Sequence, residues 1–338
     1  MPTSRVLLAM LLTAALAGLA GCGGRQASAP APSGAAGGSG CEVQNDTRLS
    51  IATGNTGGVY YVLGGRFGEL VTQATGGKLK ATAAETGGSV QNIQQLGAGT
   101  HQVAMSLADS AADALNGKGP FEGKPQQIAA LGQMYPNYTQ LVARADAGIN
   151  SVADLRGKRV STGSPRSGTE LIANRVLAAA GLNPERDVAA QRLDLGTSVD
   201  GMKGGTVDAL FFSGGLPTPN ITDLFTSMGA RATLVDTSAL LETMRRSSPV
   251  YDVATIPGST YPGARDTPTI VAPNLILVPT SMDPAVACVL TRTFYERLPE
   301  LAVANPSAKD IKLETARNTE PIPLHPGAKQ ALDSLGAR

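Results

Sequence analysis

Apolar residues recur along much of the chain in a repeated unit of strand, glycine-rich turn and helix. The first unit has an apolar strand at Leu49–Ala52, followed by a helix whose apolar residues from Val59 to Val71 follow helical spacing. The second unit has a strand at Leu79–Ala84 and a helix with the same spacing, and another buried strand follows at Gln102–Leu107. This alternation predicts an α/β fold with a mainly parallel sheet.

The same cycle continues through the rest of the chain. Further strands are predicted at Thr139–Ala143, Arg159–Ser161, 207–215 and 269–281. Gly168–Ala180 is predicted as a helix that Gly181 closes in a left-handed conformation, and Asp283 with Pro284 opens another helix. About 295 residues follow the N-terminal segment, which is more than one hydrophobic core usually holds, so two lobes are expected.

The N-terminus has the layout of a secretory signal. Arg5 precedes an apolar run from Val6 to about Leu19, which is shorter than the roughly 20 residues of a membrane-spanning helix. The residues Leu19-Ala20-Gly21-Cys22 resemble a bacterial lipobox, which predicts a signal peptide at 1–21 and a lipidated Cys22; the alternative is a plain secretory signal with an unrelated cysteine. Residues 22–45, rich in Gly, Ala, Ser and Pro, are predicted to form a flexible tether.

Charge and composition exclude some partners. The formal net charge is +1, and removal of Arg5 with the signal leaves 27 basic and 27 acidic residues, so no nucleic-acid partner is expected. Aromatic residues make up 4% of the chain and Trp is absent, which argues against a sugar-stacking surface. Cys41 and Cys288 remain in an oxidising compartment, where they form either a disulfide or two free thiols.

Three glycine-rich turns, at 53–58, 86–89 and 162–169, each lie between the carboxyl end of a strand and the start of a helix. Ligands of open α/β sheets bind at this edge, where helix N-termini present unpaired N–H groups and a partial positive charge. Together the turns predict a site for a small anion, although each alone is also typical of an ordinary capped turn. Tyr60, just after the first turn, is predicted either to contact the ligand or to pack in the core.

Motifs of nucleotide binding and catalysis are missing from the sequence. No Gly-Lys pair is followed by Ser or Thr, and no G-x-G-x-x-G follows a strand. The chain has two histidines, His101 and His325, without a G-x-S-x-G elbow or a metal-ligand spacing, and His325 is predicted to cap a turn. We therefore expect no cofactor, no metal and no enzymatic activity. A hydrolase or transferase, or a surface sensor lipoprotein on the same scaffold, remains the alternative.

Seven collinear segments between about 49 and 338 resemble the TAXI family, the solute receptors of tripartite ATP-independent periplasmic (TRAP) transporters. They are ATGNTGGVYYVLGG (52–65), ETGGSVQNIQQL (85–96), DLRGKRVSTGSPRSGTE (154–170), MKGGTVDALFFSGGLPT (202–218), IPGSTYPG (256–263), VAPNLILV (271–278) and PLHPGA (323–328). The resemblance implies a type II periplasmic-binding-protein fold with crossover strands at Thr139–Ala143 and Leu275–Pro279. Lobe 1 is then 46–139 plus 280–338, and lobe 2 is 140–279.

The resemblance also implies a function and a ligand site. The expected protein is a monomeric, lipid-anchored extracytoplasmic receptor that passes glutamate, glutamine, 2-oxoglutarate or a related carboxylate to an ion-gradient-driven permease. The ligand residues carried over are Thr53, Asn55, Thr56, Gly57, Tyr60, Ser89, Asn92, Ser164, Ser167, Gly168, Thr169, Phe212, Gly214 and Gly215. Arg166 stands where the family usually has a small residue, and it either pairs with a second carboxylate of the ligand or is a solvated loop residue.

Overall fold

The computed structural model describes residues 41–338, so the predicted signal peptide at 1–21, Cys22 and most of the predicted tether lie outside the described residues. Its strands are β1 (Thr47–Ala52), β2 (Leu79–Ala84), β3 (Val103–Leu107), β4 (Ile128–Arg144), β5 (Arg159–Ser161), β6 (Ala189–Gln191), β7 (Ala209–Gly214), β8 (Ala232–Leu234), β9 (Asp252–Ile256) and β10 (Thr267–Pro279). Its α-helices are α1 (Val59–Ala74), α2 (Ser89–Gly97), α3 (Ala108–Asn116), α4 (Gly168–Ala179), α5 (Leu195–Gly204), α6 (Pro219–Met228), α7 (Leu241–Ser247), α8 (Pro284–Glu296), α9 (Leu298–Ala304) and α10 (Pro326–Ser334). Within this part of the chain, no helix is both long enough and apolar enough to span a bilayer.

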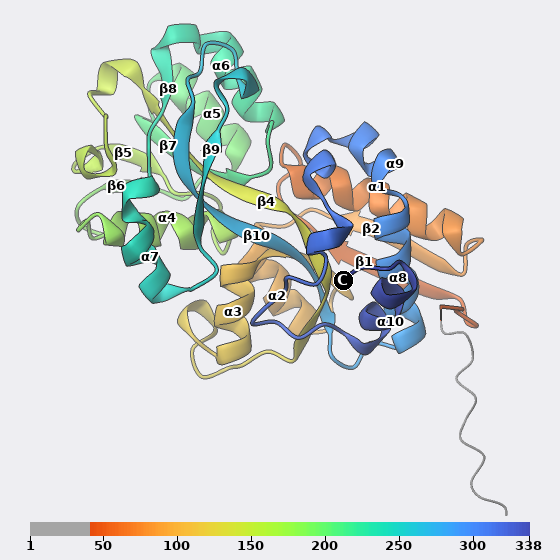
Figure 1. Cartoon of the computed structure of the whole chain (residues 1–338). Helices are drawn as coiled ribbons and strands as arrows, with labels where there is room; N and C mark the ends of the chain where they lie inside the picture. The colour runs from red at the N-terminus through yellow and green to blue at the C-terminus, as the bar shows by residue number, and fades with distance from the viewer. Residues whose placement is uncertain (1–40) are drawn as a thin grey trace, which may run out of the picture. The chain divides into compact units, whose positions relative to one another are not determined.

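The strands form one sheet in the order β2-β1-β3-β10-β4-β7-β5-β6, with β8 added on β4 and β9 on β10. Strands β1, β2 and β3 pair in parallel, as do β7, β5 and β6. The two long strands β4 and β10 are antiparallel to each other and to their other partners. The predicted α/β alternation is confirmed (Figure 1). The prediction of a mainly parallel sheet is wrong, because β4 and β10 are antiparallel to every partner and make the sheet mixed.

Strands β4 and β10 join two lobes. At one end β10 pairs with β3, and at the other end β4 and β10 pair with β7, β8 and β9. We call β1–β3 with α1–α3 and α8–α10 lobe 1, and β5–β9 with α4–α7 lobe 2. Figure 1 shows β4 and β10 running side by side between these two groups.

Helices cover both faces of the sheet in each lobe. In lobe 1, one core packs Phe67 of α1 against Phe294 of α8, and a second core lies under α2 and α3. In lobe 2, Ile172 of α4 belongs to one core and Phe225 of α6 to another. Each lobe is therefore a layered α/β sandwich with its own buried cores.

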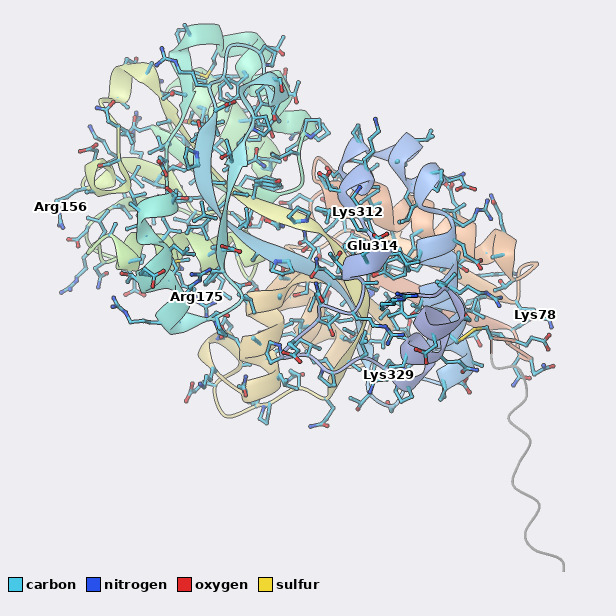
Figure 2. All side chains as sticks on the ribbon, viewed as in Figure 1. Lys78, Arg156, Arg175, Lys312, Glu314 and Lys329 are labelled. Carbon is cyan, nitrogen blue, oxygen red and sulfur yellow. A yellow bond between two sulfur atoms is a disulfide. The ribbon has the colours of Figure 1, made fainter. Side chains whose placement is uncertain are left out.

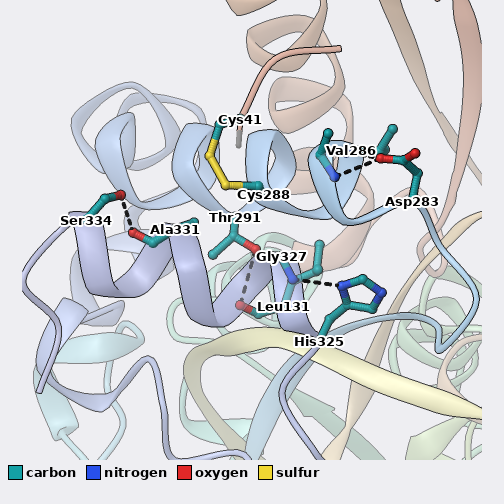
Figure 3. Close-up of a disulfide and its surroundings, with 11 residues drawn as sticks. Cys41, Leu131, Asp283, Val286, Cys288, Thr291, His325, Gly327, Ala331 and Ser334 are labelled. Atoms are coloured by element: carbon teal, nitrogen blue, oxygen red, sulfur yellow. Dashed lines mark hydrogen bonds between the residues drawn. A yellow bond between two sulfur atoms is a disulfide. The ribbon is translucent and has the colours of Figure 1, made fainter. Parts of the chain in front are cut away.

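A disulfide joins Cys41 to Cys288 on α8, with a Cα–Cα separation of 5.1 Å (Figure 3). Cys41 and Val43 pack against the core of lobe 1, so the first described residues are attached to this lobe. At the start of α8, the Asp283 carboxylate accepts the N–H groups of Ala285 and Val286, which confirms the predicted cap.

His325 lies nearby and caps α10, where its Nδ1 accepts the Gly327 N–H at 3.2 Å (Figure 3). Burial lowers the pKa of His325, which agrees with a neutral ring that accepts this hydrogen bond.

Candidate functional site

A cavity of about 50 Å³ lies between the lobes, compared with roughly 10–15 Å³ for one water. The first turns of α1, α2 and α4 surround it, together with parts of β4 and β7. The residues that line it are Gly54, Asn55, Gly58, Val59, Tyr60, Gly87, Gly88, Ser89, Leu107, Tyr135, Asn137, Gly163, Ser164, Ser167, Gly168, Thr169, Leu193, Leu195, Ser198, Phe211, Phe212, Ser213 and Gly214. We call this cavity the cleft.

Helix N-termini supply a partial positive charge at the cleft. Helices α1 and α2 begin at Val59 and Ser89 without a side-chain cap and without an acidic residue in the first turn. Their first N–H groups are therefore not neutralised by a carboxylate of their own helix. The third helix, α4, begins at Gly168 with Ser167 as its cap.

Three hydroxyl groups of the lining already accept a backbone N–H. Ser89 accepts from Leu107 at 3.1 Å, Ser167 from Glu170 at 2.9 Å and Thr169 from Ser213 at 3.1 Å. Because a hydroxyl is both a donor and an acceptor, each can still donate its hydrogen. These bonds hold the three oxygens in place and leave donors for a bound anion.

The cleft is electrically neutral. None of the residues that line it is Asp, Glu, Lys, Arg or His. Burial raises the pKa of the Tyr60 and Tyr135 phenols well above their usual range, so both remain protonated at neutral pH. An anion bound here would meet dipoles and hydroxyl donors rather than a cationic side chain.

A network of polar side chains crosses the joining strands beside the cleft. The Tyr60 hydroxyl donates to Oδ1 of Asn274 on β10, and Nδ2 of Asn137 on β4 donates to the same oxygen at 2.9 Å. The Ser213 hydroxyl on β7 donates to Oδ1 of Asn137. The network therefore connects the first helix of lobe 1 with a central strand of lobe 2.

The lobes contact each other around the cleft, and glycines permit this contact. A Cβ added at Gly87 would lie 2.7 Å from the Pro165 carbonyl oxygen, and one at Gly57 would lie 2.5 Å from Nδ2 of Asn220. Two interlobe hydrogen bonds lie beside these contacts, from the Ser164 hydroxyl to Oδ1 of Asn55 at 3.0 Å and from the Gln91 N–H to the Arg166 carbonyl at 2.9 Å. The structure is therefore the closed arrangement of the two lobes.

Most of the predicted ligand residues lie at the cleft. Those that line it are Asn55, Tyr60, Ser89, Ser164, Ser167, Gly168, Thr169, Phe212 and Gly214. Among residues that the sequence did not single out, Tyr135, Asn137, Ser198 and Ser213 also line it. Asn137 and Tyr135 lie inside β4. In the sequence, the sign that they could contact a ligand was a polar group within an otherwise apolar strand.

Other predicted residues lie outside the lining. Thr53 is fully buried and donates to the Ala84 carbonyl at 2.6 Å, while the Asn92 amide donates to the carbonyls of Thr53 and Met105. Both side chains therefore fasten strand ends of lobe 1 to each other and to α2.

Thr56 and Arg166 are exposed, and neither they nor Gly57 and Gly215 line the cleft. The Arg166 backbone, with φ of 62°, turns the loop: its N–H donates to Glu170, and its carbonyl accepts the Gln91 N–H.

A family comparison agrees with this architecture. The model of the NMT1-like family matches residues 51–336. The chain belongs to the NMT1-like family. The match includes all three glycine-rich turns and both strands that join the lobes.

Solved structures share the fold of this NMT1-like protein. A protein from Bordetella bronchiseptica RB50 is 19% identical, with 86% of this chain and 88% of that chain covered and a TM-score of 0.53. A binding protein component of a phosphonate ABC transporter from Pseudomonas aeruginosa is 10% identical, with coverage of 79% and 81% and a TM-score of 0.51. The predicted two-lobed, type II periplasmic-binding-protein fold is confirmed.

A second interlobe contact in this NMT1-like protein is ionic. Arg175 of α4 donates to Asp109 at 3.1 Å and to Asp113 at 2.6 Å, and both carboxylates are on α3. Tyr251 donates to Asp109 at 2.5 Å and accepts from Arg175 at 3.0 Å. Burial raises the pKa of Asp113 while the Arg175 charge opposes that rise. We call these four side chains the Arg175 cluster.

No group of three or more His, Cys, Asp or Glu side chains in residues 41–338 is placed to hold a metal ion. In this NMT1-like protein, the polar groups at the cleft are helix N-termini, hydroxyls, phenols and side-chain amides.

Proposed function

We propose that this NMT1-like protein is an extracytoplasmic solute receptor that captures a small carboxylate, such as glutamate or a related dicarboxylate, for a membrane transporter. The observation that carries the proposal is the closed, neutral cleft, in which two uncapped helix N-termini and a third N-terminus surround one cavity. Such termini favour an anion. The absence of a cation from the lining means that a second carboxylate would also depend on neutral donors.

The transporter class rests on the resemblance to TAXI receptors. We propose that the permease is of the TRAP type and is driven by an ion gradient. The binding protein from a phosphonate transporter supports solute capture as a use of this fold. In the same proposal, Cys22 carries a lipid after removal of residues 1–21, and the protein is a monomer. The tether, predicted at 22–45, then ends at Cys41, because the disulfide and the packing of Cys41 and Val43 attach the chain to lobe 1 from that point.

The joining strands support the proposed division into lobes. We assign 46–139 plus 280–338 to lobe 1 and 140–279 to lobe 2, because β4 and β10 pass between the two sets of cores. Closure of these lobes over the solute would give the permease a state that it can distinguish from the open protein.

Calorimetric titration tests the proposal. The purified protein, freed of carried-over solute by unfolding and refolding with its disulfide intact, is titrated with small carboxylates and amino acids. We expect saturable binding, and Ser167→Ala is expected to weaken it, because a hydrogen bond to a charged group contributes about 1.5–3 kcal/mol, or roughly 10- to 150-fold in Kd.

Thr56→Val is the matched control, since Thr56 is exposed and outside the lining, and it should bind as the wild type does. A folded protein that binds no member of the panel would contradict the proposed ligand class.

A further inference from the structure

Tyr135 is a buried side chain in the cleft whose hydroxyl group has no partner. The residue is 1% exposed, and it lines the cleft from within β4. Its hydroxyl makes no hydrogen bond to any described residue. Tyr60, beside it, already donates its hydroxyl hydrogen to Asn274. Of the two phenols in the cleft, Tyr135 is therefore the one with an uncommitted hydrogen.

The surroundings of Tyr135 hold the ring in place. Its carbonyl oxygen accepts Nδ2 of Asn274 at 2.9 Å, which fixes the backbone. A Cβ on Gly215 would lie 2.8 Å from Cε2 of Tyr135, so the ring edge packs directly on the Gly215 backbone. A donor fixed in this way loses little conformational freedom when a ligand accepts its hydrogen bond.

The position of Tyr135 differs from that of the helix N-termini. It comes from a strand that joins the lobes, whereas the termini of α1, α2 and α4 form other parts of the wall. A buried donor without an acceptor is costly, and a ligand oxygen would satisfy it. A solute that bound only to the helix N-termini would give this donor no acceptor.

We propose that Tyr135 determines solute specificity, by donating a hydrogen bond to a second oxygen of a solute whose carboxylate lies at the helix N-termini. The solute class is then a carboxylate with a further carbonyl, hydroxyl or carboxylate oxygen. Simple monocarboxylates are discriminated against, because they leave the Tyr135 hydroxyl without a partner. This inference rests on the proposed function.

Tyr135→Phe tests the inference because it removes only the hydroxyl. The probes are butyrate, 2-oxobutyrate, glutarate, 2-oxoglutarate and L-glutamate, each titrated into the wild type and the variant by calorimetry. We expect Tyr135→Phe to lower the affinity for the probes that have a second oxygen by about 10- to 100-fold. Butyrate should bind both proteins equally weakly. The Tm of the solute-free variant should stay equal or rise, since an unpaired buried polar group is removed.

Tyr295→Phe is the matched control. Tyr295 is also a buried tyrosine, but its hydroxyl donates to the Gln133 carbonyl at 2.6 Å and it does not line the cleft. This control should lower the Tm of the solute-free protein and leave affinity unchanged.

Two results would overturn the role of Tyr135 alone. One is equal affinity of wild type and Tyr135→Phe for every probe that binds. The other is a loss of affinity that comes with a lower Tm of the solute-free variant, because that would assign Tyr135 to packing. If the folded wild type binds no probe, the proposed function and this inference fall together.

Discussion

Glycines at the rim of the cleft permit close contact between the lobes because they have no Cβ. Gly87 meets the Pro165 carbonyl of the opposite lobe, and Gly168 meets Ser89, with 2.6 Å between the added Cβ and Oγ. Real Cβ atoms do not approach this closely, so a methyl group at Gly87 would hold the lobes apart and one at Gly168 would force the side chain of Ser89 to shift. Glycine, which has no Cβ, lets backbone amides come close to a ligand, and in this structure it also lets the two lobes come close to each other.

Gly87→Ala should therefore weaken solute binding by at least about 10-fold, which corresponds to about 1.4 kcal/mol. The contact is with a backbone oxygen, which cannot move aside as a side chain can. Calorimetry gives the affinity, and small-angle X-ray scattering should show a larger radius of gyration with solute present than in the wild type.

Gly65→Ala is the control, because Gly65 lies in α1 and an added Cβ there meets nothing within 4 Å. It should leave affinity unchanged and raise stability by roughly 0.5–1 kcal/mol. Wild-type affinity in Gly87→Ala would mean that closure does not require this contact.

Sequence position predicted which turns reach the cleft, but not which side chains within them do. Thr53 and Asn55 are two residues apart in the same turn, yet Thr53 bonds to a strand end and Asn55 lines the cleft. The direction of each side chain depends on backbone torsions that the partner strand and helix impose. Asn92 is a second example of a side chain whose direction could not be predicted, since its amide donates hydrogen bonds to carbonyls at the ends of two strands.

At the scale of elements, the Arg175 cluster joins α3 of lobe 1 to α4 of lobe 2. Asp109 and Asp113 are four residues apart on one helix face, where like charges repel. Asp109 is fully buried, and Arg175 is 16% exposed. The two helices therefore depend on the Arg175 cation whenever the lobes are closed.

Arg175→Met should destabilise the protein by on the order of 3–5 kcal/mol, because it leaves two buried carboxylates without their cation. Each kcal/mol corresponds to a Tm decrease of roughly 2–4 °C in a domain of this size. Differential scanning calorimetry measures the change. The variant should also bind solute more weakly. Its unpaired carboxylates are hydrated when the lobes open, so the open state is favoured over the closed state that holds the solute.

Arg156→Met is the matched control. Both arginines are labelled in Figure 2, and Arg156 forms a 2.8 Å ion pair with Asp187 while 60% exposed. Exposed pairs contribute about 0–1 kcal/mol, so Tm should hardly change. Equal Tm values for the two variants would show that burial of the Arg175 cluster adds no stability.

The joining strands also show how far a pattern along the chain predicts elements. The predicted segments Thr139–Ala143 and Leu275–Pro279 lie within β4 and β10, but β4 begins already at Ile128. Gly132 and Pro136 interrupt its apolar run, and both residues usually mark a turn. Here the pairing with β10, where Pro136 lies opposite Pro273, keeps the strand extended.

At the scale of the whole molecule, the lining of the cleft makes the affinity for solute nearly independent of pH. No ionisable acid or base of the usual neutral range lines it, and burial raises the pKa of both Tyr60 and Tyr135. Both phenols therefore keep their protons well above pH 9, while a solute carboxylate with a pKa near 4 is ionised above about pH 6.

We expect Kd to change by less than about twofold between pH 6 and pH 9. Stability should behave differently, because unfolded tyrosines release their protons near pH 10 and the buried ones retain them. Tyr261 has a pKa raised by burial to about 12, so its contribution to stability is lost as pH rises above 10. Titrations at several pH values and alkaline unfolding curves measure the two effects. A single ionisation in the Kd profile near pH 7 would contradict a neutral cleft.

The pairing of β4 with β10 places the two ends of lobe 2 side by side. Tyr138 lies opposite Val271 in this pair, so the intervening chain leaves lobe 1 and returns to it at one point. An inserted domain has this arrangement. We therefore expect that recombination at the joining strands could replace lobe 2 as one unit and leave the core of lobe 1 unchanged.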